Sequence, residues 1–276
     1  MKKSFLLLFI IMPFFNYGQS NEILDFKPGY TPETIYNQTV TNSSDYEMTY
    51  SGSEKLLEVL KKNGTENPVK VKNVFNVETV AKTGKMGKDG NFPITIEYLQ
   101  SSDINGKNII PNGTLLFGNA TLSSMPKLDS IVAKGMEENL KNSIFQMVQS
   151  TFNQLAMPEK KLKAGESFSQ ESPLAIPLAG INLEMVITTT YNLKNITAKS
   201  AFFDIVQVYS MKISDTGFET GGSGNGTGKL VYDIPNHFIS ENTLDMELNL
   251  KLKHTDFNID LISKSAYSQV VKISKK

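Results

Sequence analysis

The chain has 276 residues with equal numbers of acidic and basic residues, 28 of each, and it has no cysteine and no tryptophan. All of the basic residues are lysine, so no guanidinium group is present to grip a carboxylate or phosphate through two hydrogen bonds. The absence of cysteine excludes disulfides and thiolate metal sites, and the balanced charge lacks the basic footprint of a nucleic-acid-binding protein.

The N-terminal segment predicts an export signal. Lys2 and Lys3 precede the apolar run Phe5–Met12, which ends in a polar break. This run is shorter than the roughly 20 residues that cross a bilayer, and we expect no transmembrane segment further along the chain. We therefore expect residues 1–18 to be a signal peptide and residues 19–276 to be exported, to the periplasm or outside the cell.

The first part of the exported chain, residues 19–125, reads mainly as strands. Ser53 is a suitable N-cap for a short helix over Glu54–Lys62. Val69–Val80 and Pro93–Leu99 then alternate between apolar and polar residues on either side of a turn-rich segment, which predicts a pair of antiparallel strands.

The middle of the chain predicts one long helix over residues 129–155. This segment contains no proline, and apolar residues recur every four positions, which is typical of a helix with one buried face. The apolar stripe broadens toward the C-terminal end, which indicates contact on more than one side. We therefore expect this helix to be a central rod.

The last part, residues 158–276, again alternates, most regularly over Leu244–Lys253, and a turn or bulge is expected near His254–Asp256. The predicted fold class is α+β: antiparallel β-sheet, curved, packed on one long central helix. The exported chain then forms a single domain, or two β halves, 19–125 and 158–276, joined by the helix.

One resemblance adds to this interpretation. Gln154–Lys160 ends the predicted helix at a proline, and Lys163–Phe168 supplies a Gly-Glu-Ser-aromatic step into long strands. This arrangement resembles a group of secreted, β-rich Bacteroidota domains of unknown function, although Phe168 stands where we expect tryptophan. The resemblance implies an envelope or extracellular setting, and it brings no catalytic residues.

No segment carries a clear chemical motif. Gly221–Gly228 is followed by Lys229, but a strand rather than a helix follows, so a flexible hairpin tip is expected instead of a phosphate loop. His237 and His254 have no partner at metal-site spacing. Asp256–Asp260 lacks the Gly and Glu that complete a calcium loop. We therefore expect no catalytic residue, no cofactor and no metal site.

Two apolar features favour a binding interpretation: the methionine-bearing face of the long helix and the proline-rich segment near residue 174. A curved sheet around a helix can enclose an apolar ligand such as a lipid. The alternative is that these side chains simply fill the core. The candidate lining residues are Met136, Leu140, Ile144, Met147, Val148, Phe152, Leu174, Ile176 and Leu178.

Three functional hypotheses remain open. The first is a non-enzymatic exported protein that binds a hydrophobic ligand, and a cavity between helix and sheet would favour it. The second is a structural or protein-interaction module of the envelope, which an exposed apolar patch or an unpaired edge strand would favour. The third is a hydrolase with an unrecognised site, which requires a pocket where a histidine meets a carboxylate.

Overall fold

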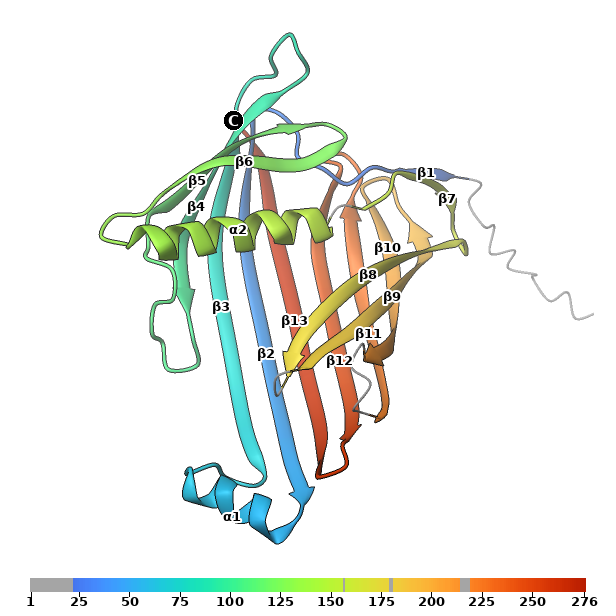
Figure 1. Cartoon of the computed structure of the whole chain (residues 1–276). Coiled ribbons are helices and arrows are strands. Elements are labelled where there is room, and N and C mark those ends of the chain that lie inside the picture. Colours follow the sequence, from blue (N-terminus) through green and yellow to red (C-terminus); the bar gives the residue numbers. More distant parts are fainter. Residues whose placement is uncertain (1–21, 156, 179–180, 214–218) are drawn as a thin grey trace, which may run out of the picture.

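The computed structural model describes residues 22–155, 157–178, 181–213 and 219–276, so the predicted signal peptide lies outside the described residues (Figure 1). The described chain is nearly all strand, with two helices, α1 (Glu54–Lys62) and α2 (Glu138–Leu155). The short helix predicted at α1 is confirmed, with Ser53 as its N-cap. The strands are β1 (Ile23–Phe26), β2 (Thr34–Gly52), β3 (Val69–Thr83), β4 (Phe92–Ser102), β5 (Thr114–Thr121), β6 (Ser124–Val132), β7 (Lys160–Lys163), β8 (Ser167–Leu178), β9 (Ile181–Ile196), β10 (Ser200–Ile213), β11 (Glu219–Asp233), β12 (Phe238–Lys253) and β13 (Phe257–Lys275).

Eleven of the described strands form one antiparallel sheet in the order β6-β5-β4-β3-β2-β13-β12-β11-β10-β9-β8. The sheet consists of two meanders, β2 to β6 and β8 to β13, and β2 pairs with β13 from Thr34–Lys275 to Gly52–Phe257. The two remaining strands, β1 and β7, pair with each other. Because β6 and β8 lie at opposite edges, the segment that connects them has to cross the sheet.

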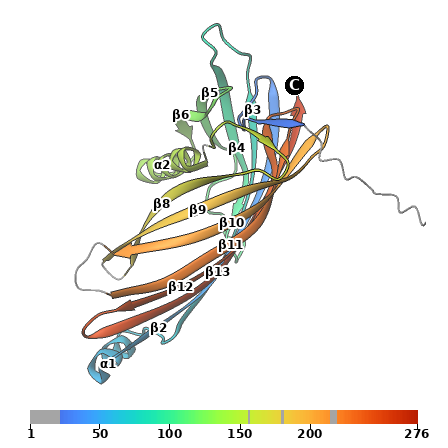
Figure 2. The same ribbon diagram turned by 90° about the vertical axis from the view of Figure 1, so that its right-hand side faces the viewer.

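Helix α2 is this crossing segment. The sheet curls, and α2 runs across its inner face (Figures 1 and 2). Its 18 residues give a length of about 27 Å, which is five to six strand spacings. Gln149 fixes it to the sheet edge: the N–H of Leu128 donates to Gln149 Oε1 at 2.7 Å, and Gln149 Nε2 donates to the carbonyl of Pro126 at 3.4 Å. The side-chain amide thus occupies edge positions of β6 that another strand would otherwise pair with.

The predicted helix over residues 129–155 starts too early. Its first four residues belong to β6, where Val132 pairs with Leu115 and is 55% exposed. Gly135 follows with a φ of 75°, and the helix begins only at Glu138. Val132 precedes the apolar residue Met136 by four positions, which is the spacing of one more helical turn. The residue is nevertheless in a strand, because it pairs with β5.

The helix is also not a central rod for both halves. Its buried residues join a core cluster made mainly with β2 to β6, to which the C-terminal meander adds Val271 and, partly buried, Phe238 and Ile273. The second cluster, beneath the C-terminal meander, contains no residue of α2. That second cluster is closed by Leu24 and Phe26 of β1 and Leu162 of β7. The predicted α+β class, with sheets packed on one long central helix, is therefore wrong, and the described structure is a nearly all-β sheet that carries α2 over one half.

The glycine-rich segment Gly221–Gly228 is not a hairpin tip, because it lies within β11. Side chains of β10 lie over these glycines on the inner face. A Cβ atom on Gly222 would stand 2.7 Å from Met211 Cε, and a Cβ on Gly224 would overlap the ring of Tyr209. Glycine is therefore required here by the close approach of neighbouring side chains within a strand.

We predict that Gly224→Ala lowers the free energy of unfolding by about 1–3 kcal/mol, because the added methyl group displaces the buried Tyr209 ring. Gly221→Ala in the same strand is the control, since a Cβ there meets nothing within 4 Å, and its effect should stay within about 0.5 kcal/mol. Urea denaturation of both variants measures the difference. Equal effects would contradict the packing argument.

We predict that Gln149→Ala lowers the free energy of unfolding by about 1–2 kcal/mol, because it leaves the part-buried N–H of Leu128 without its acceptor. Gln146→Ala is the matched control, because Gln146 is exposed on the same helix. Thermal unfolding followed by circular dichroism measures both. A loss of stability in the control as large as in Gln149→Ala would refute the role given to the amide.

Candidate functional site

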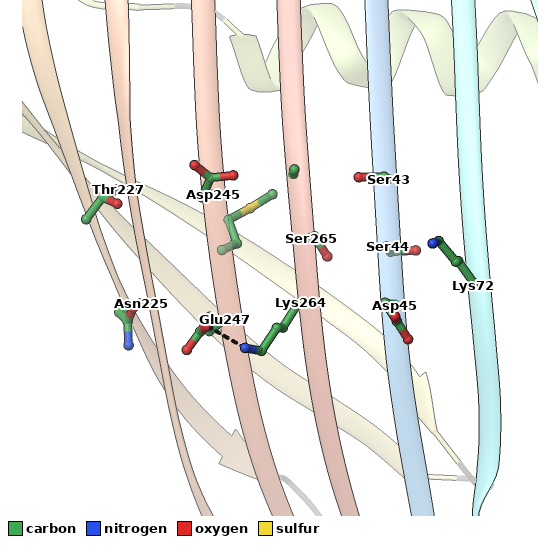
Figure 3. A pocket seen from close by; sticks show the side chains of 12 residues that line it. Ser43, Ser44, Asp45, Lys72, Asn225, Thr227, Asp245, Glu247, Lys264 and Ser265 are labelled. Carbon is green, nitrogen blue, oxygen red and sulfur yellow. Dashed lines mark ion pairs between the residues drawn. The ribbon is translucent and has the colours of Figure 1, made fainter.

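A hollow of about 450 Å³ lies on the outer face of the sheet, opposite α2, over β3, β2, β13, β12 and β11 (Figure 3). Its side chains are mostly polar and include Asp45, Lys72 and Asp245. Lys264 Nζ lies 3.1 Å from Glu247 Oε1, and both side chains are more than half exposed. Such surface ion pairs contribute little free energy. This hollow is a shallow, open depression in a solvent-exposed face of the sheet, and no buried group points into it.

A smaller cavity of about 90 Å³ lies on the inner face, where α2 ends. Its walls are mostly apolar: Phe152 from α2, Met157 just after it, Met125 from β6, and Phe238 and Ile239 from β12. Sites for small apolar ligands have this composition, an apolar wall with few polar groups. We take this cavity as the candidate site, although it is the smaller of the two, because it is partly enclosed and its walls are mostly apolar.

Polar groups of the sheet line one side of this cavity. The hydroxyl of Tyr267 donates to Gln269 Oε1 at 2.6 Å, and burial raises the pKa of Tyr267 to about 12, so the phenol stays protonated. Asn242 Oδ1 is different: it is buried and has no hydrogen-bond partner among the described residues. A buried acceptor without a donor costs about 1–3 kcal/mol.

An aromatic cluster supports the cavity wall. The ring centroid of Phe238 lies 5.1 Å from that of Tyr30 and 4.6 Å from that of Tyr36. The N–H of Thr31 donates to the hydroxyl of Tyr36 at 2.8 Å, which holds this ring in place. Burial raises the pKa of Tyr30, so its hydroxyl is neutral as well. These contacts hold the wall of the cavity in position.

Below the cavity the inner face continues as an apolar strip along β12. Leu244, Met246 and Leu248 are half-buried on this face, while the residues between them are exposed on the other face. The strip runs from Asn242 at the cavity to Leu250, which is buried. These nine residues are joined by eight steps along the strand, which give the strip a length of about 27 Å.

The lining residues predicted on the long helix are either exposed or packed in the core, and of them only Phe152 lines the cavity. The exposed residues are Leu140, at 50%, and Met147, at 51%. The members packed in the core with β2 to β6 are Met136, Ile144, Phe152 and, partly buried, Val148.

The predicted residues near position 174 lie in β8, the edge strand of the sheet. Leu174 is 38% exposed, and the side chains of Ile176 and Leu178 lie outside the described residues. Pro173 and Pro177 remove two backbone donors from this strand. Prolines of this kind protect an edge against pairing with another chain, so β8 gives little support to an interaction module.

The polar side of the cavity was not predicted from the sequence, although the sequence contains a signal for it. Asn242 occupies the apolar phase of β12, in line with Leu244, Met246 and Leu248. A polar residue in an otherwise apolar row indicates a buried hydrogen-bonding group. The aromatic wall gave no such signal, because Tyr30 and Phe238 meet only through the tertiary fold.

Each histidine lies near an acidic side chain. His237 lines a hollow of about 360 Å³ together with Asp25, Lys27 and Glu159, and its Nδ1 lies 3.1 Å from the hydroxyl of Tyr232. No hydrogen bond or ion pair joins His237 to either carboxylate among the described residues. His254 lies elsewhere, in the turn between β12 and β13, with its Nδ1 3.8 Å from Oδ2 of the exposed Asp256. The described residues also include no cluster of three or more histidine or acidic side chains suited to a metal ion.

Comparisons with known proteins place few constraints on this chain. No protein-family model matches it, and no curated protein is similar to it. Among solved structures, a multiply substituted mutant of the Rh. blastica porin aligns with 86% of this chain and 100% of its own, at 8% sequence identity and a TM-score of 0.32. A likeness at this TM-score carries no inference about fold or function. Neither helix in the described part of the chain is long and apolar enough to cross a membrane.

We predict that Asn242→Leu raises the free energy of unfolding by about 1 kcal/mol or more, because it replaces a buried, unpaired acceptor with an apolar side chain of similar size. Asn249→Leu is the matched control, with the same substitution on the exposed face of the same strand. Urea denaturation of the ligand-free proteins compares them. A loss of stability in Asn242→Leu would show that the amide is satisfied in solution.

Proposed function

We propose that this chain is an exported, non-enzymatic protein that binds an apolar small molecule, such as one with a lipid chain. The ligand lies on the inner face of the sheet, with one end in the cavity beneath the end of α2. The observation that carries this proposal is the mostly apolar cavity on the inner face, lined by Phe152, Met157 and Phe238.

The size of the cavity supports a ligand that extends beyond it. About 90 Å³ is less than the roughly 150 Å³ of an engineered protein cavity that accepts benzene, so it accommodates only the end of a chain. The half-buried strip Leu244–Leu248 continues from it and supplies further apolar contact. Burial of a methylene group contributes about 0.8 kcal/mol, so a chain that follows this strip gains affinity with each added carbon.

The proposed export fits this role. The apolar run of residues 1–18 reads as a signal peptide, and outside the cytoplasm an apolar molecule needs a protein to shield it from water. The ligand is held without covalent chemistry, since the cavity contains no nucleophile beside a base.

The test combines native mass spectrometry of the purified protein with titration by N-decyl dansylamide, a dye that fluoresces in apolar surroundings and whose ten-carbon chain can place its end in the cavity. We expect saturable binding of one dye molecule per chain. Ile239→Phe, which fills the cavity, should weaken binding at least tenfold. Ile262→Phe on the exposed outer side of β13 is the matched control and should bind as the unchanged protein does.

Circular dichroism and thermal unfolding of both variants establish that they are folded. Unsaturable binding of the dye, or equal binding by folded Ile239→Phe and Ile262→Phe, would remove the cavity as the binding site.

A further inference from the structure

We infer that the ligand carries a long, unbranched hydrocarbon chain of about 16–19 carbons, and that the buried Leu250 sets this limit by closing the apolar strip of β12. This inference rests on the proposed function and names the class of ligand by the length of its chain.

The cavity receives the end of the chain. Phe152, Met157 and Phe238 line it, and its volume of about 90 Å³ holds roughly three carbon groups, if each takes about the 30 Å³ of a water molecule. The engineered cavity that accepts benzene is larger, roughly 150 Å³, so a ring at this end of the ligand does not fit. An unbranched chain end does.

Two side chains below the cavity face inward without an apolar cover. Met246 and Leu248 are half-buried on the inner face of β12, and among the described residues they belong to none of the three hydrophobic core clusters. Their partners on β13 are Ser265 and Ser263, whose side chains are too short to cover them. A hydrocarbon chain on the β13 side of the strip would remove the apolar surface of both residues from water.

The other side of the strip is filled. On β11 it is flanked by Gly226 and Gly224, but the side chains of Gln207 and Tyr209 lie over these glycines. The hydroxyl of Tyr209 donates to Gln207 Oε1 at 2.9 Å, which holds both side chains in place. The ligand chain therefore lies beside the serines of β13.

Leu250 ends the strip. It is 1% exposed and belongs to a core cluster with Leu252 and Ile259. Met48 and Met211 pack against this cluster. A chain that reached Leu250 would have to displace these side chains, so carbons beyond Leu248 add no affinity.

The length of the open strip fixes the length of the chain. The distance along β12 from Asn242 to Leu248 is about 20 Å. In an extended chain each C–C bond of about 1.5 Å advances the chain by roughly 1.25 Å, so about 16 carbons span this distance. Up to about three more occupy the cavity.

The experiment titrates the protein with N-alkyl dansylamides whose chains have 10, 18 and 22 carbons, each below the concentration at which it self-associates. We expect the 18-carbon dye to bind at least tenfold more tightly than the 10-carbon dye, because its further carbons cover the strip. The 22-carbon dye should bind within twofold of the 18-carbon dye, because its last carbons find no apolar surface.

Two variants test the lower part of the strip. Ser263→Phe fills the open side beside Leu248 and should reduce the advantage of the 18-carbon dye to less than threefold, with the 10-carbon dye unchanged. Leu248→Ser removes apolar contact without added bulk and should reduce the advantage at least threefold. Ser268→Phe is the matched control, with the same substitution on the outer face of β13, and should keep the advantage. Circular dichroism establishes that each variant is folded.

Each other outcome has a defined meaning. An advantage of the 18-carbon dye below tenfold, or a gain of more than twofold from 18 to 22 carbons, overturns the inference and leaves the proposed function standing. The full advantage in folded Ser263→Phe or Leu248→Ser also overturns it. If the 10-carbon dye shows no saturable binding, the proposed function fails and the inference fails with it.

Discussion

The pairing of β2 with β13 is the constraint on which the rest of the structure depends. It joins the N-terminal and C-terminal meanders into one sheet and continues the alternation of side chains from one to the other. A shift of one residue in this pairing would turn every side chain of one meander to the opposite face. It also places β6 and β8 at opposite edges, so the connecting segment crosses the sheet and α2 lies on the inner face.

Different elements cover the hydrophobic cores of the two halves of the sheet. The N-terminal half uses the buried face of α2, with Ile144 and Phe152 among its core residues. The C-terminal half uses the small β1–β7 pair, where Phe26 contacts Phe168 and Phe203 at centroid distances of 5.5 and 5.3 Å. The cavity lies where α2 ends, next to β12. A cavity at such a junction follows from the short length of the helix relative to the sheet.

The apolar row of β12 is interrupted at one position. Asn242 brings into it an acceptor that no described residue satisfies, which costs stability. Beside it, the contacts of Phe238 with Tyr30 and Tyr36 support the cavity wall.

The sequence by itself determined the features that depend on neighbouring residues. The period-two alternation over Leu244–Lys253 appears in the structure as one face turned inward and one exposed, and the cap and length of α1 follow from Ser53 and the residues after it. Composition excluded disulfides and thiolate metal sites. Asn242 was visible as a polar residue in an apolar row, but its meaning was not.

Only the tertiary structure decided what depends on residues far apart in the chain. The segment Asp129–Val132 became a strand because β5 pairs with it, and the glycines of β11 lie in a strand because Tyr209 packs over them. The cavity itself brings Tyr30, Phe152 and Phe238 together from three distant segments. Local periodicity measures which face of a segment is apolar, but it contains no information on which distant partner will cover that face.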